Sequence, residues 1–322
     1  MSAIVIITFP GVEPLEVAGP SAVFARARAL VPSAPEVIFA SPQGGNVQAD
    51  GGMVLAETRA LRGLSGPFDL LLVAGGTETG LTALRDSGLY EWLAQEAPRA
   101  RRVGSVCGGA FVLARAGLLA GRLATTHWRA TGRLQAAYPD VDVQPDAIFT
   151  LDGPTCTSAG VTAGIDLALA LVEADHGATV AARIAQDLVV FLRRPGGQSQ
   201  FSEALKAQVQ GSSALRAALE EMQSHPAQDL SVNRLAALCA MSPRNFTRRF
   251  TAEIGTPPAA FVAAARIDHA RRLLLTTELA VASIAYASGF GSAEALTHAF
   301  RAKLGQSPSE CRSRHRSAYS PE

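Results

Sequence analysis

Residues 104–128 read GSVCGGAFVLARAGLLAGRLATTHW, and this stretch decides the fold of the first half of the chain. A short apolar run that ends at Val106 turns through Cys107, Gly108 and Gly109 into a helical pattern. A strand that turns sharply into a helix places the residue at the turn at the carboxyl edge of a sheet, where open α/β folds bind ligands. The sequence therefore predicts a ligand crevice around Cys107.

The segments on either side repeat this alternation of strands and helices. Buried strands are expected at residues 3–9, 36–40, 69–74 and 101–106, and a strand or turn near 157–160. Helices are expected at residues 20–30, 110–119, 163–175 and 179–192. Alternation of this kind implies a parallel sheet covered by helices on both faces. We therefore expect residues 1–195 to form a doubly wound, flavodoxin-like α/β domain.

The pattern breaks at Pro195, Gly196 and Gly197, which cannot continue a helix, and residues 196–212 are predicted as a linker. Every strand signal disappears after residue 213. Helical patterns at 230–241 and 244–254 form one helix–turn–helix outline, and those at 281–287 and 292–304 form a second. A longer helix at 258–275 joins the two. Residues 213–322 are thus predicted as an all-α domain with two helix–turn–helix units.

Length and composition agree with two domains, because the chain has 322 residues and 48% of them are hydrophobic. The net charge of +1 divides into −3 for residues 1–210 and +4 for residues 211–322. This split is a weak indication that the second part faces nucleic acid. No window resembles a membrane span or a secretion signal, so a cytoplasmic protein without membrane contact is expected. The four cysteines form no CxxC spacing and no phosphate-loop motif occurs, so neither a metal nor a cofactor is expected.

The two helix–turn–helix units each show a buried stripe and a polar outer face. In the second unit Leu296, Phe300 and Leu304 recur at four-residue steps, and in the first Phe246, Phe250 and Ile254 do so. Arginine pairs with guanine and asparagine with adenine, so the outer faces suit base recognition. The residues expected to contact DNA are Arg244, Asn245, Arg248 and Arg249 in the first unit, and Ser292, Glu294, Thr297, His298 and Arg301 in the second.

The spacing of the units supports the same interpretation. About 20 residues of connecting helix span roughly 30 Å, close to one turn of DNA at about 34 Å. Two units at this distance can enter successive major grooves on one face of a duplex.

The segment GFGSAEALTHAFRAKLGQSPSECR, at residues 289–312, resembles the AraC/XylS signature. The resemblance covers about residues 213–315. Cys311 departs from the family pattern, which usually has an aromatic residue there, and this affects packing after the last turn more than DNA contact. The resemblance implies sequence-specific binding to double-stranded operator DNA.

The first domain resembles the ThiJ/PfpI superfamily, which is related to class I glutamine amidotransferases. The match rests on residues 104–128, PLEVAGPSAVF after the first strand, the Gly75-Gly76 turn and TSAGVTAGIDLAL. The resemblance implies that Glu16 sits against the cysteine and that His127 lies near it. The ligand-binding residues expected on this basis are Glu16, Gly75, Gly76, Cys107, Gly108 and His127. Asp166 is expected to cap its helix, and Cys156 to be an ordinary packed residue.

A chain with both parts looks like a GlxA-type transcriptional regulator. The resemblance implies that the first domain senses a small, nitrogen-containing metabolite and dimerises, with RNA polymerase as a further partner. An alternative is a cysteine-dependent enzyme of hydratase, amidase or glyoxalase type, with Cys107 as nucleophile and Glu16 and His127 as proton-transfer groups. Sensing is favoured, because Gly108 stands where enzymatic relatives often carry a hydroxyl residue. A helix N-terminus should lower the pKa of Cys107, and a thiolate is the form of cysteine that is oxidised. Redox sensing through Cys107 is therefore a third hypothesis.

Overall fold

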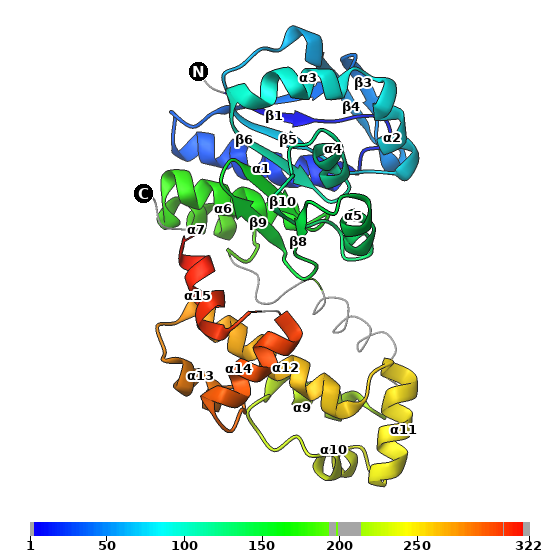
Figure 1. Ribbon diagram of the computed structural model, residues 1–322, viewed down its shortest axis with the longest axis vertical. Helices are drawn as coiled ribbons and strands as arrows, with labels where there is room; N and C mark the ends of the chain where they lie inside the picture. The colour runs from blue at the N-terminus through cyan, green and yellow to red at the C-terminus, as the bar shows by residue number, and fades with distance from the viewer. Residues whose placement is uncertain (1–2, 193–197, 199–213, 305, 318–322) are drawn as a thin grey trace. The chain divides into compact units, whose positions relative to one another are not determined.

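The structure is a computed structural model that describes residues 3–192, 198, 214–304 and 306–317 (Figure 1). The chain divides into two compact units, one built on Met1–Arg194 and the other on Pro195–Ser320. Apart from Gln198, the predicted linker at residues 196–212 lies outside the described residues. In the described part of the chain, no helix is both long and apolar enough to cross a membrane.

The first unit is built on an eight-stranded sheet with the order β3-β4-β2-β1-β5-β6-β10-β9. The strands are β1 (Ala3–Ile7), β2 (Glu36–Ser41), β3 (Gly45–Gln48), β4 (Val54–Ala60), β5 (Phe68–Val73), β6 (Ala100–Val106), β9 (Phe149–Asp152) and β10 (Thr155–Ser158). The strands β7 (Leu123–Ala124) and β8 (Asp142–Val143) pair separately. Every residue of β1 is buried, as expected for a strand covered on both faces.

The six strands from β4 to β10 pair in parallel, which confirms the doubly wound core. At both edges the sheet departs from the parallel pattern, because β3 and β9 pair antiparallel with β4 and β10. Each edge strand comes just before its partner in the chain, with only a few residues between them. A connection that short closes a hairpin but cannot cross over to a parallel neighbour.

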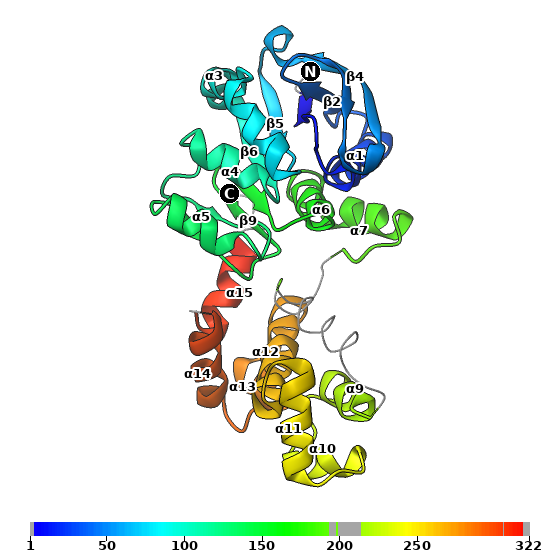
Figure 2. The same ribbon diagram turned by 90° about the vertical axis from the view of Figure 1, so that its right-hand side faces the viewer.

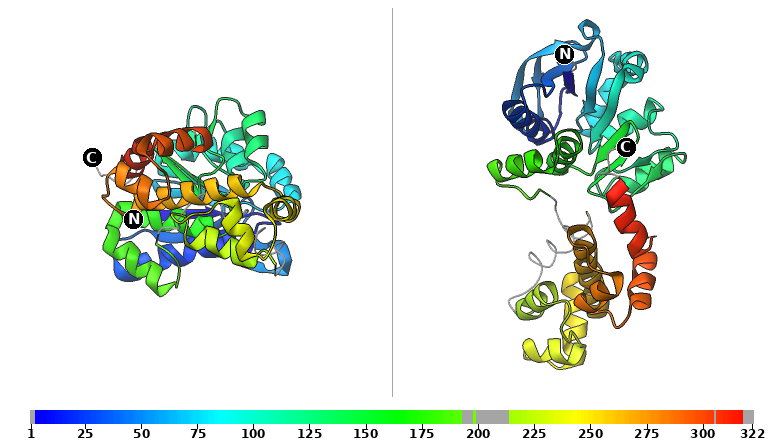
Figure 3. Two further views of the ribbon diagram at one scale, coloured as in Figure 1. Left: turned by 90° about the horizontal axis from the view of Figure 1, so that it is seen from below. Right: turned by 90° about the vertical axis from the view of Figure 1, so that its left-hand side faces the viewer.

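Helices cover both faces of this sheet. They are α1 (Pro14–Leu30), α2 (Glu78–Ala83), α3 (Leu89–Glu96), α4 (Gly109–Arg115), α5 (Thr131–Ala137), α6 (Ala163–His176) and α7 (Ala178–Asp187). In Figure 2, α1, α6 and α7 lie on one side of the sheet and α3 and α4 on the other. The opposite view in Figure 3 shows the same division.

The helix α1 starts six residues before its predicted position. Pro14 occupies the start of the helix, and the side chain of Glu13 accepts a hydrogen bond from the Leu15 N–H at 3.3 Å. Pro20, expected at the start, lies inside the helix. A proline there removes one main-chain hydrogen bond, and the early start is what brings Glu16 into the first helical turn.

The second unit is helical throughout its described residues. Its helices are α9 (Arg216–Ser224), α10 (Val232–Leu238), α11 (Pro243–Ile254), α12 (Pro258–Thr276), α13 (Val281–Ala287), α14 (Ala293–Leu304) and α15 (Pro308–Ser317). Ser231, Ser242 and Ser292 each accept a hydrogen bond from a main-chain N–H three residues ahead, so serine side chains cap α10, α11 and α14. The pairs α10–α11 and α13–α14 are the two predicted helix–turn–helix units.

Two separate apolar cores stabilise this unit, and α12 contributes to both. Phe246, Phe250 and Phe261 belong to the first core, whereas Leu296 and Phe300 belong to the second. The expected buried stripes are confirmed, although Leu304 is only half-buried.

Arg266 of α12 connects the two halves of the helical unit. Its Nε donates to the Pro226 carbonyl at 2.9 Å, in the loop before α10. In the turn of the second helix–turn–helix, Gly289 has a φ of 78°, and a Cβ built there would lie 2.7 Å from the same Nε. A glycine is therefore required where the second turn approaches Arg266.

Candidate functional site

The carboxyl ends of β1, β5 and β6 meet where the strand order reverses. The chain runs from β1 to β2 on one side and returns to β5 on the other. Glu16 follows β1, Gly75 follows β5 and Cys107 follows β6. Open α/β sheets bind ligands at such a reversal, so the three residues define a candidate crevice.

Cys107 has the backbone geometry of a nucleophile elbow. Its φ is 51°, in the left-handed region that residues with a side chain rarely adopt. The Cys107 N–H donates to the Ser158 carbonyl at 2.9 Å, and the Thr126 hydroxyl donates to the Cys107 carbonyl at 2.7 Å. These hydrogen bonds hold the strained turn in place, as expected at a functional site.

The glycines around the elbow leave no room for side chains. A Cβ on Gly109 would lie 2.2 Å from the Val73 carbonyl oxygen. A Cβ on Gly75 would lie 2.6 Å from Glu16 Oε2 and 2.7 Å from the Gly108 nitrogen. A Cβ on Gly76 would lie 2.4 Å from the Gly11 carbonyl oxygen. The crevice is thus formed by backbone at close approach, with Glu16 and Cys107 as its polar side chains.

Glu16 is 1% exposed and contacts Cys107, as the resemblance implied. Its Oε2 accepts from the Gly75 N–H at 2.6 Å, and its Oε1 accepts from the Val161 N–H at 3.3 Å. A side-chain hydrogen bond joins the carboxylate to the Cys107 thiol. Burial raises the pKa of Glu16 despite these hydrogen bonds.

The expected low pKa of Cys107 is wrong. Burial raises the pKa of the thiol, and the neighbouring Glu16 carboxylate raises it further. The N–H groups of Gly108 and His127 hydrogen-bond to the sulfur and oppose this shift without overcoming it. Burial and the neighbouring Glu16 therefore both favour the neutral thiol of Cys107, against the helix N-terminus, which favours the thiolate.

His127 lies near Cys107, as the resemblance implied. A Cβ on Gly160 would contact both the His127 Cδ2 at 3.0 Å and the Cys107 Sγ at 3.5 Å, so the two side chains flank one glycine. The His127 Nδ1 accepts from the Arg129 N–H at 3.3 Å. Burial lowers the pKa of His127, so the imidazole is neutral at pH 7.

The loop after β10 also belongs to the crevice, and residue-type reasoning missed it. Val161 has a φ of 38° and aims its N–H at Glu16, while Gly160 lies between Cys107 and His127. The TSAGVTAGID stretch marks this loop in the sequence. Its contribution to the crevice comes from main-chain atoms, however, and residue types do not reveal such a contribution. Asp166 is 6% exposed in the first turn of α6, and Cys156 is buried as expected, with its pKa raised to about 12 by burial.

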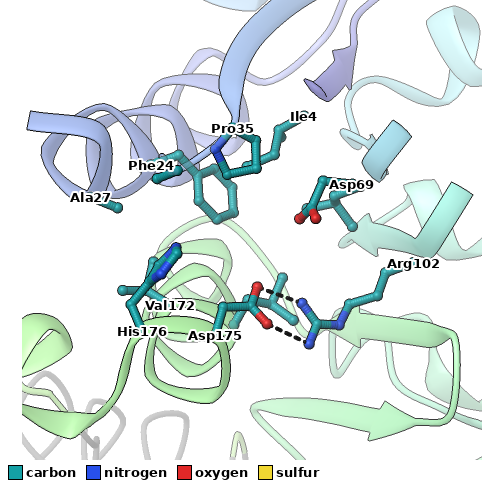
Figure 4. A pocket seen from close by; sticks show the side chains of 12 residues that line it. Ile4, Phe24, Ala27, Pro35, Asp69, Arg102, Val172, Asp175 and His176 are labelled. Carbon is teal, nitrogen blue, oxygen red and sulfur yellow. Dashed lines mark hydrogen bonds and ion pairs between the residues drawn. The ribbon is translucent and has the colours of Figure 1, made fainter. Parts of the chain in front are cut away.

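A second pocket opens at the opposite, amino edge of the sheet (Figure 4). Ile4, Phe24 and Leu171 contribute to its apolar wall, and Arg102 and Asp175 to its polar side. Arg102 binds Asp175 through two hydrogen bonds of 2.7 and 2.9 Å. The sequence did not predict this pair, since 73 residues separate its members.

A charge network surrounds Asp175. Arg101 also binds Asp175, and its Nε donates to Asp69 at 2.9 Å. The two guanidinium groups hold the pKa of Asp175 at about 2, below its ordinary value, even though burial opposes the shift. The network joins the start of β6 to the end of α6, so we interpret it as a structural clamp.

We expect Asp175→Asn to reduce the free energy of unfolding of the first unit by about 1–2 kcal/mol at pH 7, a figure that allows for solvent screening at the half-exposed Arg101. A carboxyl with a depressed pKa contributes its full stability above pH 4 and loses it as the pH falls toward 2. Denaturant unfolding of the wild type and of Asp175→Asn should therefore show a difference in the free energy of unfolding that shrinks from pH 4 to pH 2. The exposed Asp140 provides the control, because Asp140→Asn should show no such convergence.

The second candidate site is the outer surface of the helical unit. Arg244 and Arg248 are exposed on α11, and Asn245 is half-buried, with its Oδ1 accepting from Arg248 at 3.0 Å. On α14, Glu294, His298 and Arg301 are exposed, whereas Ser292 and Thr297 are half-buried. Arg249 differs from its neighbours, because its Nε binds Glu253 at 2.7 Å one turn along the same helix.

These features define a class of protein that joins an α/β unit with a carboxyl-edge crevice to a helical unit with paired helix–turn–helix motifs. The chain belongs to the DJ-1/PfpI family, whose model matches residues 1–174, and a helix-turn-helix domain model matches residues 235–314. These matches confirm the resemblance seen in the sequence.

Relatives with the same two parts cover most of the chain. The HTH-type transcriptional regulator CdhR of Pseudomonas aeruginosa is 35% identical over 84% of this chain and 80% of its own length. The HTH-type transcriptional regulator GlxA of Rhizobium meliloti is 30% identical over 87% of this chain and 85% of its own. An isonitrile hydratase of Pseudomonas putida is 39% identical, but over only 33% of this chain and 45% of its own.

Solved structures agree with the fold of the first unit. The crystal structure of an AraC family transcriptional regulator from Pseudomonas putida matches 58% of this chain and all of its own, with 25% identity and a TM-score of 0.52. A ThiJ/PfpI family protein from Pseudomonas syringae matches 81% of this chain and 90% of its own, with 22% identity and a TM-score of 0.54. At 22% identity, the likeness to the Pseudomonas syringae protein shows a shared fold alone.

Proposed function

We propose that this protein is a ligand-responsive, sequence-specific DNA-binding transcription regulator. The observation that carries the proposal is the pair of helix–turn–helix motifs sharing α12, each with a buried apolar stripe and an exposed polar face. The regulators CdhR and GlxA, which resemble the chain over both units, support it. Operator DNA, a small effector, RNA polymerase and a second copy of the chain are the proposed partners.

The DNA-reading residues proposed for α11 are Arg244, Asn245 and Arg248. Arg244 and Arg248 are exposed and can reach guanine, and Asn245 can pair with adenine. We exclude Arg249 from base reading, because its guanidinium is bound by Glu253. On α14 the residues proposed to contact base edges or phosphates are Ser292, Glu294, Thr297, His298 and Arg301.

Arg248→Ala tests base reading by α11. A bidentate contact with a base contributes about 1–3 kcal/mol of discrimination, so the Kd for the preferred duplex should rise roughly 5- to 150-fold. Preference should weaken at one or two base pairs only. The measurement is fluorescence anisotropy with a duplex that the wild-type chain selects from a random pool.

Arg249→Ala is the matched control, since it removes the same charge from the next position of the same helix. It should change affinity by a similar small factor for all duplexes. If Arg248→Ala weakens every duplex equally and lowers the salt dependence, Arg248 contacts phosphate and does not read a base.

The proposed effector site is the crevice formed by Glu16, Gly75, Gly76, Cys107, Gly108 and His127. Its buried carboxylate favours a ligand with a nitrogen donor or a positive charge, because Glu16 can only accept hydrogen bonds when ionised. Ligand binding would shift the protein between states that differ in DNA affinity.

A thermal-shift screen of the full chain against small amines, amino acids and betaines tests this site. A ligand at 100 times its Kd should stabilise the first unit by about 2.7 kcal/mol. Glu16→Gln, which keeps the shape and removes the charge, should abolish the shift, whereas the amino-edge variant Asp175→Asn should keep it. An equal shift in the Glu16 variant would place the ligand elsewhere.

We further propose that the crevice senses its ligand without turnover. The raised pKa of Cys107 keeps the thiol protonated, and the His127 Nδ1 is occupied by the Arg129 N–H. The likeness to an isonitrile hydratase and the elbow geometry favour a cysteine-dependent enzyme as the second candidate. Isonitrile consumption by the wild type that disappears in Cys107→Ser would support the enzyme, whereas a Cys107→Ser variant with a full DNA response to effector would support the sensor.

A further inference from the structure

The first turns of α11 and α14 expose charged side chains of opposite hydrogen-bonding chemistry, Arg244 and Glu294. The α11 face carries the arginines Arg244 and Arg248, which are donors only. The first turn of α14 instead carries Glu294, an exposed carboxylate, which is an acceptor only. The inference drawn from this difference rests on the proposed function. If the chain binds DNA, the difference determines which base edges each unit can recognise.

Glu294 lies on the part of α14 that would meet base edges. Leu296 and Phe300 are fully buried and fix the inner side of the helix, while Glu294 and His298 share the outer side one turn apart. In helix–turn–helix proteins, the N-terminal residues of the second helix contact bases. Arg301 lies two turns from Glu294 on the same outer side and near the end of the helix, where phosphate contact is expected.

A carboxylate in this position restricts its partner to one kind of group. Phosphates repel it, and the only hydrogen-bond donors on the major-groove edges are the amino groups of cytosine and adenine. Glutamate characteristically accepts from the N4 amino group of cytosine, whereas the N6 amino group of adenine is read by asparagine or glutamine together with N7. The Ser292 side chain and the Glu294 N–H hydrogen-bond to the carboxylate and lower its pKa, so Glu294 is ionised at neutral pH.

We propose that Glu294 is a specificity-determining residue of the second helix–turn–helix unit, where it accepts a hydrogen bond from the N4 amino group of a cytosine in the major groove. The operator therefore requires a cytosine at one position of the half read by α14. The first unit, with its arginines, requires guanine on the strand that it reads.

A capping role for Glu294 is the structural alternative. An acidic residue in the first turn stabilises a helix through its dipole, and Ser292 already caps α14. A capping role predicts lower stability and uniformly altered affinity after substitution, but no change in which base is preferred. Base preference therefore separates the two roles.

The test is selection of duplexes from a random pool by the full-length chain, followed by sequencing. The wild type should enrich one sequence with a cytosine in one half, and replacing that cytosine should weaken binding roughly 5- to 150-fold. Glu294→Gln should shift this position toward adenine, which glutamine reads. Glu294→Ala should lose the preference there while raising affinity for unrelated DNA, because a charge that phosphates repel is gone.

Arg301→Gln is the matched control on the same helix face. It should weaken all duplexes by a similar factor, with a smaller salt dependence and an unchanged preferred sequence. Thermal unfolding of each variant shows whether α14 is intact. An unchanged cytosine in the selections with both folded Glu294 variants would overturn the inference, whereas a wild-type chain that enriches no sequence would overturn the proposed function as well.

Discussion

Replacing Phe250 by alanine should unfold the first half of the helical unit. Phe250 is fully buried, and its ring packs against Phe246 at 5.5 Å and edge-on against Phe261 at 5.6 Å between ring centroids. Truncating a buried phenylalanine reduces the free energy of unfolding by about 3–5 kcal/mol. The core that it serves is small and separate from the core around Phe300, so little stability should remain.

Circular dichroism during guanidinium unfolding of the full chain measures this effect. The helical transition of the second unit should move to lower denaturant, while the transition of the α/β unit stays in place. Phe191→Ala provides the control, because that side chain is 72% exposed and its loss should change stability by less than about 0.5 kcal/mol. Equal losses in the two variants would contradict the assignment of Phe250 to a packed core. Operator binding should fall with the fraction of folded helical unit.

Gly109→Ala should have the second large effect, on the α/β unit. The added methyl group would lie 2.2 Å from the Val73 carbonyl oxygen, and both partners belong to the main chain. Neither can move without displacing β5 or the elbow at Cys107, so we expect a loss of about 3 kcal/mol from overpacking. The crevice should be distorted as well, and ligand-induced stabilisation should disappear.

Gly132→Ala is a matched control for this substitution. Gly132 also lies in the first turn of a helix, but a Cβ there has no neighbour within 4 Å. Alanine should therefore stabilise α5 by about 0.4–1 kcal/mol through its higher helix propensity and the more restricted unfolded chain. Thermal unfolding of the two variants should thus show shifts of opposite sign, and a stable Gly109→Ala protein with a full ligand response would contradict the close approach seen at the elbow.

The central strands and many of the helices of both units could be predicted from hydrophobic periodicity, but the helices α2, α3, α5 and α15 were not predicted. Strands such as β1 and β5 are buried on both faces and therefore appear as continuous apolar runs. The outer strand β4, which pairs with the edge strand β3, is mostly exposed and has the mixed sequence VLAETRA, so it carries no such signal. Edge strands were missed because their position is set by pairing with a neighbour and not by burial.

The candidate crevice was predictable in its side chains but not in its electrostatics. The carboxyl ends of parallel strands meet at one edge, which predicts a crevice at Cys107, and the family resemblance implied that Glu16 lies beside it. The direction of the Cys107 pKa shift depends on burial and on the distance to Glu16, and neither is visible in sequence. The Val161 N–H was missed for a related reason, since its role comes from backbone direction and any residue type could supply it.

DNase footprinting of the wild-type full-length chain at moderate salt tests sequence-specific DNA recognition most directly. The probe is a duplex enriched from a random pool, and the assay is run with and without candidate effectors. If both helix–turn–helix units enter successive major grooves, each protomer should protect about two helical turns on one face of the duplex. No sequence-specific protection, in either the presence or the absence of nitrogenous metabolites, would contradict the assignment of this chain as a DNA-binding regulator.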